Sequence, residues 1–246
     1  MKILAAVGAI LSFILALYLN YLPQTEAWTG NNIGEVSDKY RTLITPASYA
    51  FSIWGIIYLS MISFLIFQSK RAIETQRPQE ELQNIRLAFI LLHLLNAAWI
   101  VSWSYEYLLL SVFLISGMLA SSVYILRQGR ATPPRDTNKR WVQYPFEIYT
   151  GWLTAATVAN ISVTIQSYDL IPLFMEGIVA LIVLFIVWWI YYRIWNHFQW
   201  FAFNLVGIWV FIAIGVNQYS SNIVVSVAAW ASAAFLLSLF APRLIR

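Results

Sequence analysis

Long, continuous apolar runs are the feature of this sequence that most restricts its fold. Each run is roughly 20 residues long, which is the length an α-helix needs to cross the hydrocarbon core of a bilayer. A strand of a membrane barrel would need only about 10 residues and would alternate polar with apolar side chains. Lipid offers the backbone no hydrogen bonds, so a spanning segment must satisfy its own, as a helix does. The sequence therefore predicts an all-α, polytopic membrane helix bundle.

Composition supports the same conclusion. Hydrophobic residues fill 60% of the 246 positions and charged residues only 11%, whereas a soluble domain carries roughly 25% charged residues. The chain has no cysteine, which excludes disulfides, thiolate nucleophiles and cysteine metal sites. The net charge of +4 comes from basic residues between the apolar runs. Membrane topology explains them better than nucleic acid does, so the expected partners are membrane lipid and a small apolar ligand.

Eight apolar runs are predicted to span the membrane. The first is interpreted as a membrane helix and not as a cleaved signal peptide, because its apolar stretch is longer than a usual signal core. Several connections are short, such as residues 106–107, so neighbouring helices are expected to be antiparallel. The predicted spans are residues 3–22, 47–68, 87–105, 108–126, 146–166, 174–192, 201–217 and 223–240.

The basic residues divide unequally between the two sides of this topology. Only Lys39 and Arg41 fall on one side, and the positive-inside rule places the richer side in the cytoplasm. Both termini are therefore predicted to be cytoplasmic. The thirteen basic residues of the richer side are Lys2, Lys70, Arg71, Arg77, Arg86, Arg127, Arg130, Arg135, Lys139, Arg140, Arg193, Arg243 and Arg246.

Three predicted helices each carry an aromatic face at helical spacing, and two of these faces include an asparagine near mid-membrane depth. Taken singly, each residue is better explained by packing, and an asparagine by a hydrogen bond between helices. Taken together, aromatic walls, small residues and a few polar groups suit a cavity for a flat apolar ligand. The long loop 23–45, with Trp28, is expected to cover it. The candidate ligand-binding residues are Phe51, Trp54, Tyr58, Asn96, Trp99, Trp103, Tyr149, Trp152, Ala156 and Asn160.

Catalytic and metal-binding patterns are not evident. The sequence has no phosphate-binding glycine loop, no zinc-helix motif and no serine nucleophile motif. His93 is a weak candidate for the axial ligand of a metalloporphyrin, and a satisfied interior histidine is the favoured interpretation. Glu147 and Glu176 lie near predicted interfaces and are expected to be solvated. Neither a metal nor a required cofactor is predicted.

Three segments carry a resemblance to a known family. They are TPASYAFSIWGIIY at residues 45–58, LNAAW at residues 95–99, and YTGWLTAATVAN at residues 149–160. In this order they resemble the second, third and fifth helices of the tryptophan-rich sensory protein and translocator protein family (TspO/MBR, also called the peripheral-type benzodiazepine receptor). That family is a five-helix bundle, and this chain resembles its extended bacterial form. The resemblance implies a five-helix core at residues 1–168, followed by three additional helices at residues 169–246 in the same membrane domain.

The resemblance also implies a function. Family members bind apolar planar molecules, such as porphyrins, sterols or related isoprenoids, in a pocket closed by the first loop. A bound tetrapyrrole is thus an expectation here, and a bacterial plasma membrane is favoured over a thylakoid. The sequence departs from the family pattern on the lid side: one proline, Pro46, stands where two are usual, and Ala50 takes the place of a phenylalanine.

Three functional classes remain open on this basis. The first is a sensor, receptor or carrier that binds a tetrapyrrole or a sterol-like or isoprenoid-like ligand. The second is a structural partner in a homodimer or a larger membrane complex, which the three additional helices motivate. The third, and least expected, is an enzyme that acts on a porphyrin or a lipid.

Overall fold

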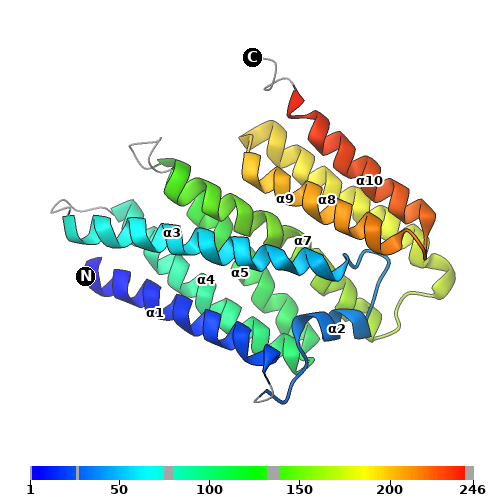
Figure 1. Cartoon of the computed structure of the whole chain (residues 1–246), viewed down its shortest axis with the longest axis horizontal. Helices are drawn as coiled ribbons and strands as arrows, with labels where there is room; N and C mark the ends of the chain where they lie inside the picture. Colours follow the sequence, from blue (N-terminus) through cyan, green and yellow to red (C-terminus); the bar gives the residue numbers. More distant parts are fainter. Residues whose placement is uncertain (1, 26–27, 75–79, 132–138, 242–246) are drawn as a thin grey trace.

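The computed structural model describes residues 2–25, 28–74, 80–131 and 139–241, and within these residues the regular elements are all helices. This confirms the predicted all-α class. Short 3-10 turns at Leu22–Gln24, Ser48–Ser52 and Leu173–Met175 and a π-turn at Lys139–Gln143 join longer elements. The α-helices are α1 Lys2–Tyr21, α2 Ile33–Lys39, α3 Ile53–Glu74, α4 Glu80–Ser104, α5 Leu108–Ala131, α7 Tyr144–Ser167, α8 Glu176–Phe198, α9 Phe201–Gln218 and α10 Ile223–Ser238 (Figure 1).

Eight of these helices correspond to the eight predicted spans, but several ends differ. Helix α4 begins at Glu80 and α8 continues to Phe198, beyond the predicted residues 87 and 192. Apolar runs mark only the part of a helix that lies in hydrocarbon, whereas the helix itself continues into the polar interface. In contrast, α3 begins at Ile53, later than the predicted residue 47, because the preceding residues form a 3-10 turn. There the Ala47 N–H donates to the Ala213 carbonyl of α9 at 3.0 Å.

Six helices of the described chain are long and apolar enough to cross a membrane by length and composition alone. Helix α7 is not one of them because its threonines and an asparagine lower its mean hydropathy. The Thr154 and Thr157 hydroxyls donate to carbonyls one turn earlier, at 2.9 and 2.7 Å, so their polarity is satisfied within the helix. Helix α7 also contacts α3, α5, α8 and α9. It is therefore the central helix of the bundle, surrounded by protein.

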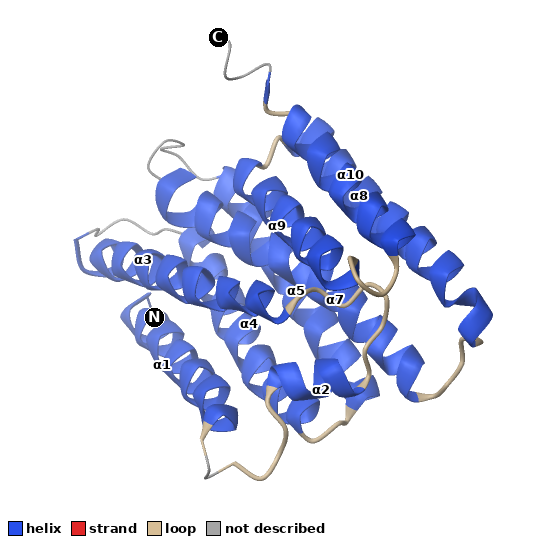
Figure 2. Cartoon of the chain, turned by 45° about the vertical axis from the view of Figure 1, so that its right-hand side comes forward, coloured by secondary structure: helices blue, strands red, loops and turns tan. Residues whose placement is uncertain are grey.

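The helices form two groups. Helices α1, α3, α4, α5 and α7 form the predicted five-helix core, in which α4 packs against α1 and α5. Helix α9 packs against α7 and α10, and α8 contacts α7, α9 and α10. Figure 2 shows α8, α9 and α10 as a layer along one side of the core, with the short α2 across one end of the bundle.

A buried glutamate lies at the junction between the two groups of helices. Glu147 of α7 is fully buried, which corrects the expectation that it is solvated. Its carboxylate accepts from the Gln143 side chain at 2.6 Å and from the Ala202 N–H at 2.9 Å. Ala202 lies in the first turn of α9, where free N–H groups and the helix dipole favour a negative charge. Glu147 thus fastens α9 to the core.

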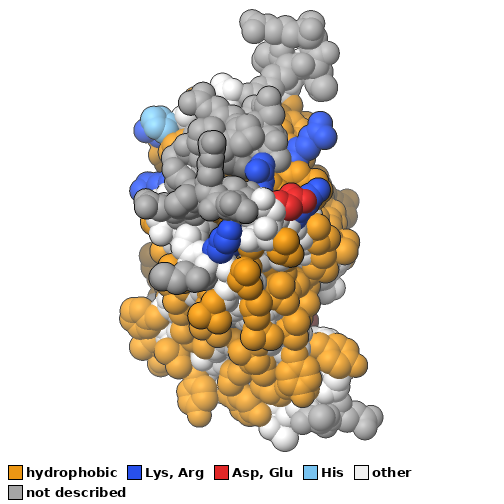
Figure 3. Space-filling model, turned by 90° about the vertical axis from the view of Figure 1, so that its left-hand side faces the viewer, with side chains coloured by type: hydrophobic (Ala, Val, Ile, Leu, Met, Phe, Trp, Pro, Cys, Tyr) orange, Lys and Arg blue, Asp and Glu red, His pale blue; other side chains and the backbone are white. Residues whose placement is uncertain are grey.

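The start of α1 and the end of α10 lie at the same end of the bundle, away from α2 (Figure 1). Figure 3 shows Lys and Arg side chains gathered in the upper part of one face and hydrophobic side chains covering the lower part. Of the thirteen basic residues assigned to this end, Arg77, Arg135, Arg243 and Arg246 lie outside the described residues. The orientation of the termini stays a prediction from charge.

Candidate functional site

A cavity of about 60 Å³ lies between the five-helix core and the additional helices, at the end of the bundle that carries α2. Five aromatic side chains from three parts of the chain face it: Phe51 before α3, Trp54 on α3, Trp99 and Trp103 on α4, and Trp152 on α7. Ala156 and Asn160 of α7 also line it. Seven of the ten candidate residues therefore meet around one space, as the shared helical faces indicated.

The aromatic rings are arranged as two walls set at a steep angle. Trp99 stacks on Trp103 with centroids 5.8 Å apart and planes 24° apart, and Trp54 continues this row at 6.2 Å and 30° from Trp99. Trp152 meets Trp54 at 78° and Phe51 meets Trp152 at 83°. The cavity is thus lined by rings in two orientations, so a flat apolar group in it could make stacked or edge contacts, both of which are favourable aromatic geometries.

Asn160 joins three helices. Its side-chain oxygen accepts from the Trp99 indole N–H at 3.1 Å, and its amide nitrogen donates to the Ser111 hydroxyl at 2.8 Å. These bonds link α7 to α4 and α5. The polar groups of the Asn160 amide are largely used within the protein, so the residue sets the position of Trp99. The buried indole N–H groups of Trp54 and Trp152, in contrast, have no hydrogen-bond partner.

The wall opposite the tryptophan row comes from the additional helices. Helix α8 contributes Val183, Leu184 and Val187, and α9 contributes Val210 and Ile214. All five side chains are aliphatic. The sequence interpretation confined the site to the first 168 residues and missed this wall, because an apolar helix face toward a cavity has the same composition as one toward lipid.

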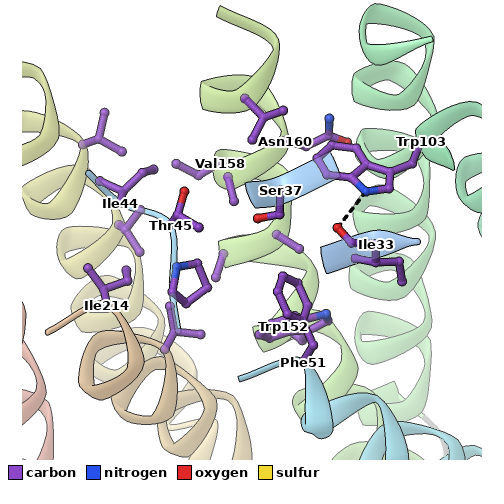
Figure 4. A pocket seen from close by; sticks show the side chains of 18 of the residues that line it. Ile33, Ser37, Ile44, Thr45, Phe51, Trp103, Trp152, Val158, Asn160 and Ile214 are labelled. Carbon is purple, nitrogen blue, oxygen red and sulfur yellow. Dashed lines mark hydrogen bonds between the residues drawn. The ribbon is translucent and has the colours of Figure 1, made fainter. Parts of the chain in front are cut away.

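Helix α2 and the segment after it close the cavity. Ile33 and Ser37 of α2, and Ile44, Thr45 and Pro46 of the following segment, line its mouth. Figure 4 shows Ile33 beside Trp103, whose indole N–H donates to the Ile33 carbonyl at 3.3 Å.

The other end of this cover is held by α9. The Asn217 side-chain amide donates to the Thr45 carbonyl at 2.9 Å. The cover therefore bridges the core and the additional helices.

Glu106, in the turn between α4 and α5, holds the outer side of α2. Its carboxylate accepts from Asn31 at 2.8 Å, from the Lys39 ammonium at 2.7 Å to each oxygen, and from the Tyr40 hydroxyl at 2.6 Å. The Ser104 carbonyl adds a bond from the Asn31 N–H at 3.0 Å. Glu106 has a φ of 61°, a left-handed conformation that is unfavourable for a residue other than glycine.

The residues of this cluster lie outside the predicted membrane spans, and their hydrogen bonds shift their pKa values. The bonds from Lys39 and then Tyr40 lower the pKa of Glu106, although burial partly opposes them. The hydrogen bond to Glu106 raises the pKa of Lys39 and the pKa of Tyr40. The carboxylate and the ammonium are thus both charged at neutral pH, and α2 is pinned by a charged cluster.

Three candidate residues, Tyr58, Asn96 and Tyr149, do not line this cavity. They lie behind Trp54, whose ring is 5.5 Å from that of Tyr58 and 5.9 Å from that of Tyr149. The Asn96 side-chain oxygen accepts from the Asn20 amide at 2.7 Å, which joins α4 to α1. These residues form the interior of the five-helix core and support the tryptophan row from behind.

His93 belongs to this interior group. Its Nδ1 lies 2.9 Å from the Phe89 carbonyl, which can only accept, so this nitrogen carries a proton. The ring packs against Phe89 at 4.1 Å and Phe13 at 5.3 Å. His93 does not line the cavity. Across the described chain, no group of three or more His, Cys, Asp or Glu side chains is placed to hold a metal.

Trp28 was expected to cover the cavity, but it is not among the residues that line it. Its ring packs against Tyr105 at 5.4 Å, next to the turn that holds Glu106. The part of the first loop that forms the cover is α2, which the hydropathy pattern did not reveal. A local signal was present: Asn32 and Glu35 form a capping box, in which each side chain bonds the backbone N–H of the other residue.

Comparison with known proteins gives one finding. The family model described as TSPO-like protein matches residues 5–241, which includes both the core and the additional helices. No curated protein and no solved structure matched the chain.

Proposed function

The chain belongs to the TSPO-like protein family and is a multi-pass integral membrane protein, and from this premise we propose that it binds an apolar ligand with a flat part in the cavity beneath α2. It would act there as a sensor, receptor or carrier. The observation that carries the proposal is the row formed by Trp54, Trp99 and Trp103, set against Trp152 around one apolar space. The basic end of the bundle is proposed to face the cytoplasm.

The dimensions of the cavity require it to open. Ligand pockets for small molecules have volumes of about 300–1,000 Å³, and this cavity has about 60 Å³. A ligand therefore enters only if the cover or one wall moves. The contacts of α2 are few: the bonds of Glu106 at its outer side, the Trp103 bond to the Ile33 carbonyl, and the buried Val36 side chain. We propose that α2 is the part that moves.

A tetrapyrrole fits the cavity in part. Its ring would pack against Trp54, Trp99 or Trp103. The indole N–H groups of Trp54 and Trp152 have no partner but are buried, so an acceptor on the ligand would reach them only after the side chains move. The described residues that line the cavity include no Lys, Arg or His, so the carboxylates of the tetrapyrrole would have no cationic partner among them. The axial-ligand role of His93 would need a different cavity, and we do not assign it.

The proposal is tested by tryptophan-fluorescence quenching in lipid nanodiscs, titrated with protoporphyrin, haem and retinol. Trp152→Ala is expected to weaken binding of the preferred ligand by about tenfold, because loss of one aromatic contact and its burial is worth about 1–2 kcal/mol. Ala156→Phe, which fills the cavity, is expected to weaken it as well. Trp189→Ala is the matched control, since Trp189 is exposed on α8 away from the cavity.

Saturable binding that both cavity variants weaken, and that the control leaves unchanged, supports the proposal. If no probe binds saturably, or if all three variants behave alike, the cavity is not the binding site. Assembly with a partner protein would then be the next function to test, by purification in a mild detergent.

A further inference from the structure

The two long sides of the cavity differ in chemistry. One side presents the stacked tryptophans of α3 and α4. The other presents branched aliphatic side chains, Val183, Leu184 and Val187 of α8 and Ile214 of α9. A rigid planar ring gains by stacking on the first side, whereas a branched hydrocarbon chain packs well against the second.

Helix α8 lies between one side of the cavity and the surface of the described bundle. Leu184 and Val187 are buried toward it, whereas Ile182 and Ile186 on the outer face of the same helix are about half exposed (55% and 48%). The outer residues are apolar and belong to a helix that is apolar enough to span a membrane. One helix therefore separates the cavity from lipid.

The two halves of α8 are held by different kinds of contact. The half farther from the cavity is fixed at Tyr191, whose hydroxyl donates to the Gly151 carbonyl of α7 at 2.8 Å. The Tyr191 ring also lies 4.7 Å from that of Phe203. Beside the cavity, α8 contributes aliphatic contacts, and lipid chains can replace these because lipid is as apolar as the side chains.

The lack of charged side chains in the described lining of the cavity disfavours a charged ligand. Among the described residues that line the cavity none is charged, and the polar side chains include Ser37, whose hydroxyl is a possible donor. The indole N–H groups of Trp54 and Trp152 also have no partner, but they are buried in the closed state. A carboxylate placed there would lose its hydration and gain no cation, which is strongly unfavourable. A neutral acceptor, such as a ketone or hydroxyl oxygen, would satisfy a donor without that penalty.

We infer that α8 and α9 form the specificity-determining wall of the cavity, and that they select an uncharged ligand with a flat head and a branched hydrocarbon chain over a carboxylated macrocycle. The head lies on the tryptophan row, and the chain lies along Leu184, Val187 and Ile214. The inference rests on the proposed function. It adds the class of the ligand and the helices, α8 and α9, that select it.

The test compares two uncharged quinones with the same flat ring system, phylloquinone with a long branched chain and menadione with none, in nanodiscs at fixed lipid. Val187→Phe on the cavity face is compared with Ile186→Phe on the outer face of the same helix. We expect Val187→Phe to weaken phylloquinone binding at least tenfold and menadione binding less than threefold, and Ile186→Phe to change neither. Val187→Ala, which adds no bulk, is expected to weaken phylloquinone binding selectively as well.

Charge is tested with protoporphyrin and its uncharged dimethyl ester. The ester is expected to bind more tightly than the free acid. Tighter binding of the acid would overturn the inference, and so would equal losses for phylloquinone and menadione in both Val187 variants. Failure of the proposed function looks different, because then no probe binds in a way that depends on Trp152.

Discussion

Replacing Glu106 by glutamine is expected to release α2 from the mouth of the cavity. The carboxylate accepts hydrogen bonds from Asn31, Lys39 and Tyr40 at 2.6–2.8 Å. Glutamine has one acceptor oxygen in place of two and no charge, so it loses the ion pair with Lys39 and cannot accept all of these bonds. The left-handed backbone conformation stays equally unfavourable, so only the side-chain contacts change.

The size of the effect follows from the exposure of the cluster. A buried hydrogen bond to a charged group contributes about 1.5–3 kcal/mol, but Glu106 is partly exposed, which reduces each of the bonds from Tyr40 and Asn31 to about 0.5–1 kcal/mol. The ion pair between Lys39 and Glu106 is screened by solvent, so it mainly orients the two side chains and adds little to the free energy. A loss of about 1–2 kcal/mol raises the population of the open state by about 5–30-fold.

Opening is measured with a single introduced thiol. The chain has no cysteine, and Ser37 of α2 is buried and lines the cavity. In a Ser37→Cys background, Glu106→Gln is expected to raise the rate of modification by a membrane-impermeant maleimide by about 5–30-fold. Asp169→Asn is the matched control, because Asp169 is an acidic residue of a turn with a similar φ of 49° between α7 and α8. It is expected to leave the rate unchanged.

The pH dependence gives a second check. Because the pKa of Glu106 is lowered, its contribution to the closed state is present above the ordinary carboxyl pKa and is lost as pH falls through the lowered value. The ratio of the two modification rates, variant over parent, is expected to be constant between about pH 6 and 8 and to approach one in acid. A ratio of one at neutral pH would refute the proposal that Glu106 holds α2 in the closed state.

Three further predictions concern stability and topology. Asn160→Ala leaves buried partners of the amide unsatisfied and is expected to destabilise the protein by about 1–3 kcal/mol, measured as a lower melting temperature in detergent. Gly207→Ala is expected to cost about 1–3 kcal/mol in the same assay, because an added Cβ would lie 2.6 Å from a ring carbon of buried Tyr191. If the termini are cytoplasmic, Ser221→Cys in the α9–α10 turn reacts with impermeant maleimide in intact cells, whereas Asn196→Cys near the end of α8 reacts only after lysis.

Much of the fold follows from the sequence because lipid imposes a simple rule on each span. Apolar runs predict where the eight long helices lie, although among the described residues only six are long and apolar enough to span a membrane. Helical spacing predicts which aromatic side chains share a face of each helix. The same reasoning cannot distinguish the two sides of that face. Tyr58 and Tyr149 share it by spacing, yet they pack behind Trp54 within the core.

The remaining parts of the site depend on contacts between distant segments. Glu106 meets Lys39 across 67 residues, and Asn217 reaches Thr45 across 172. Neither pair has a local pattern, so the sequence predicts residues 106–107 only as a short connection. Helix α2 has only seven residues, which is too short to produce a hydropathy signal. Its capping box was the one local indication.

The additional helices are best understood as part of the site. Helix α9 supplies Ile214 to the cavity wall, holds the cover through Asn217, and is itself anchored to the core by Glu147 of α7. A core without these helices would expose the α7 face between Trp152 and Asn160 to lipid and would leave the Thr45 carbonyl without its donor. A chain truncated after residue 168 is therefore expected to lose ligand selectivity along with stability, whereas a separate accessory role for these helices predicts that the truncated core binds the same ligand equally well.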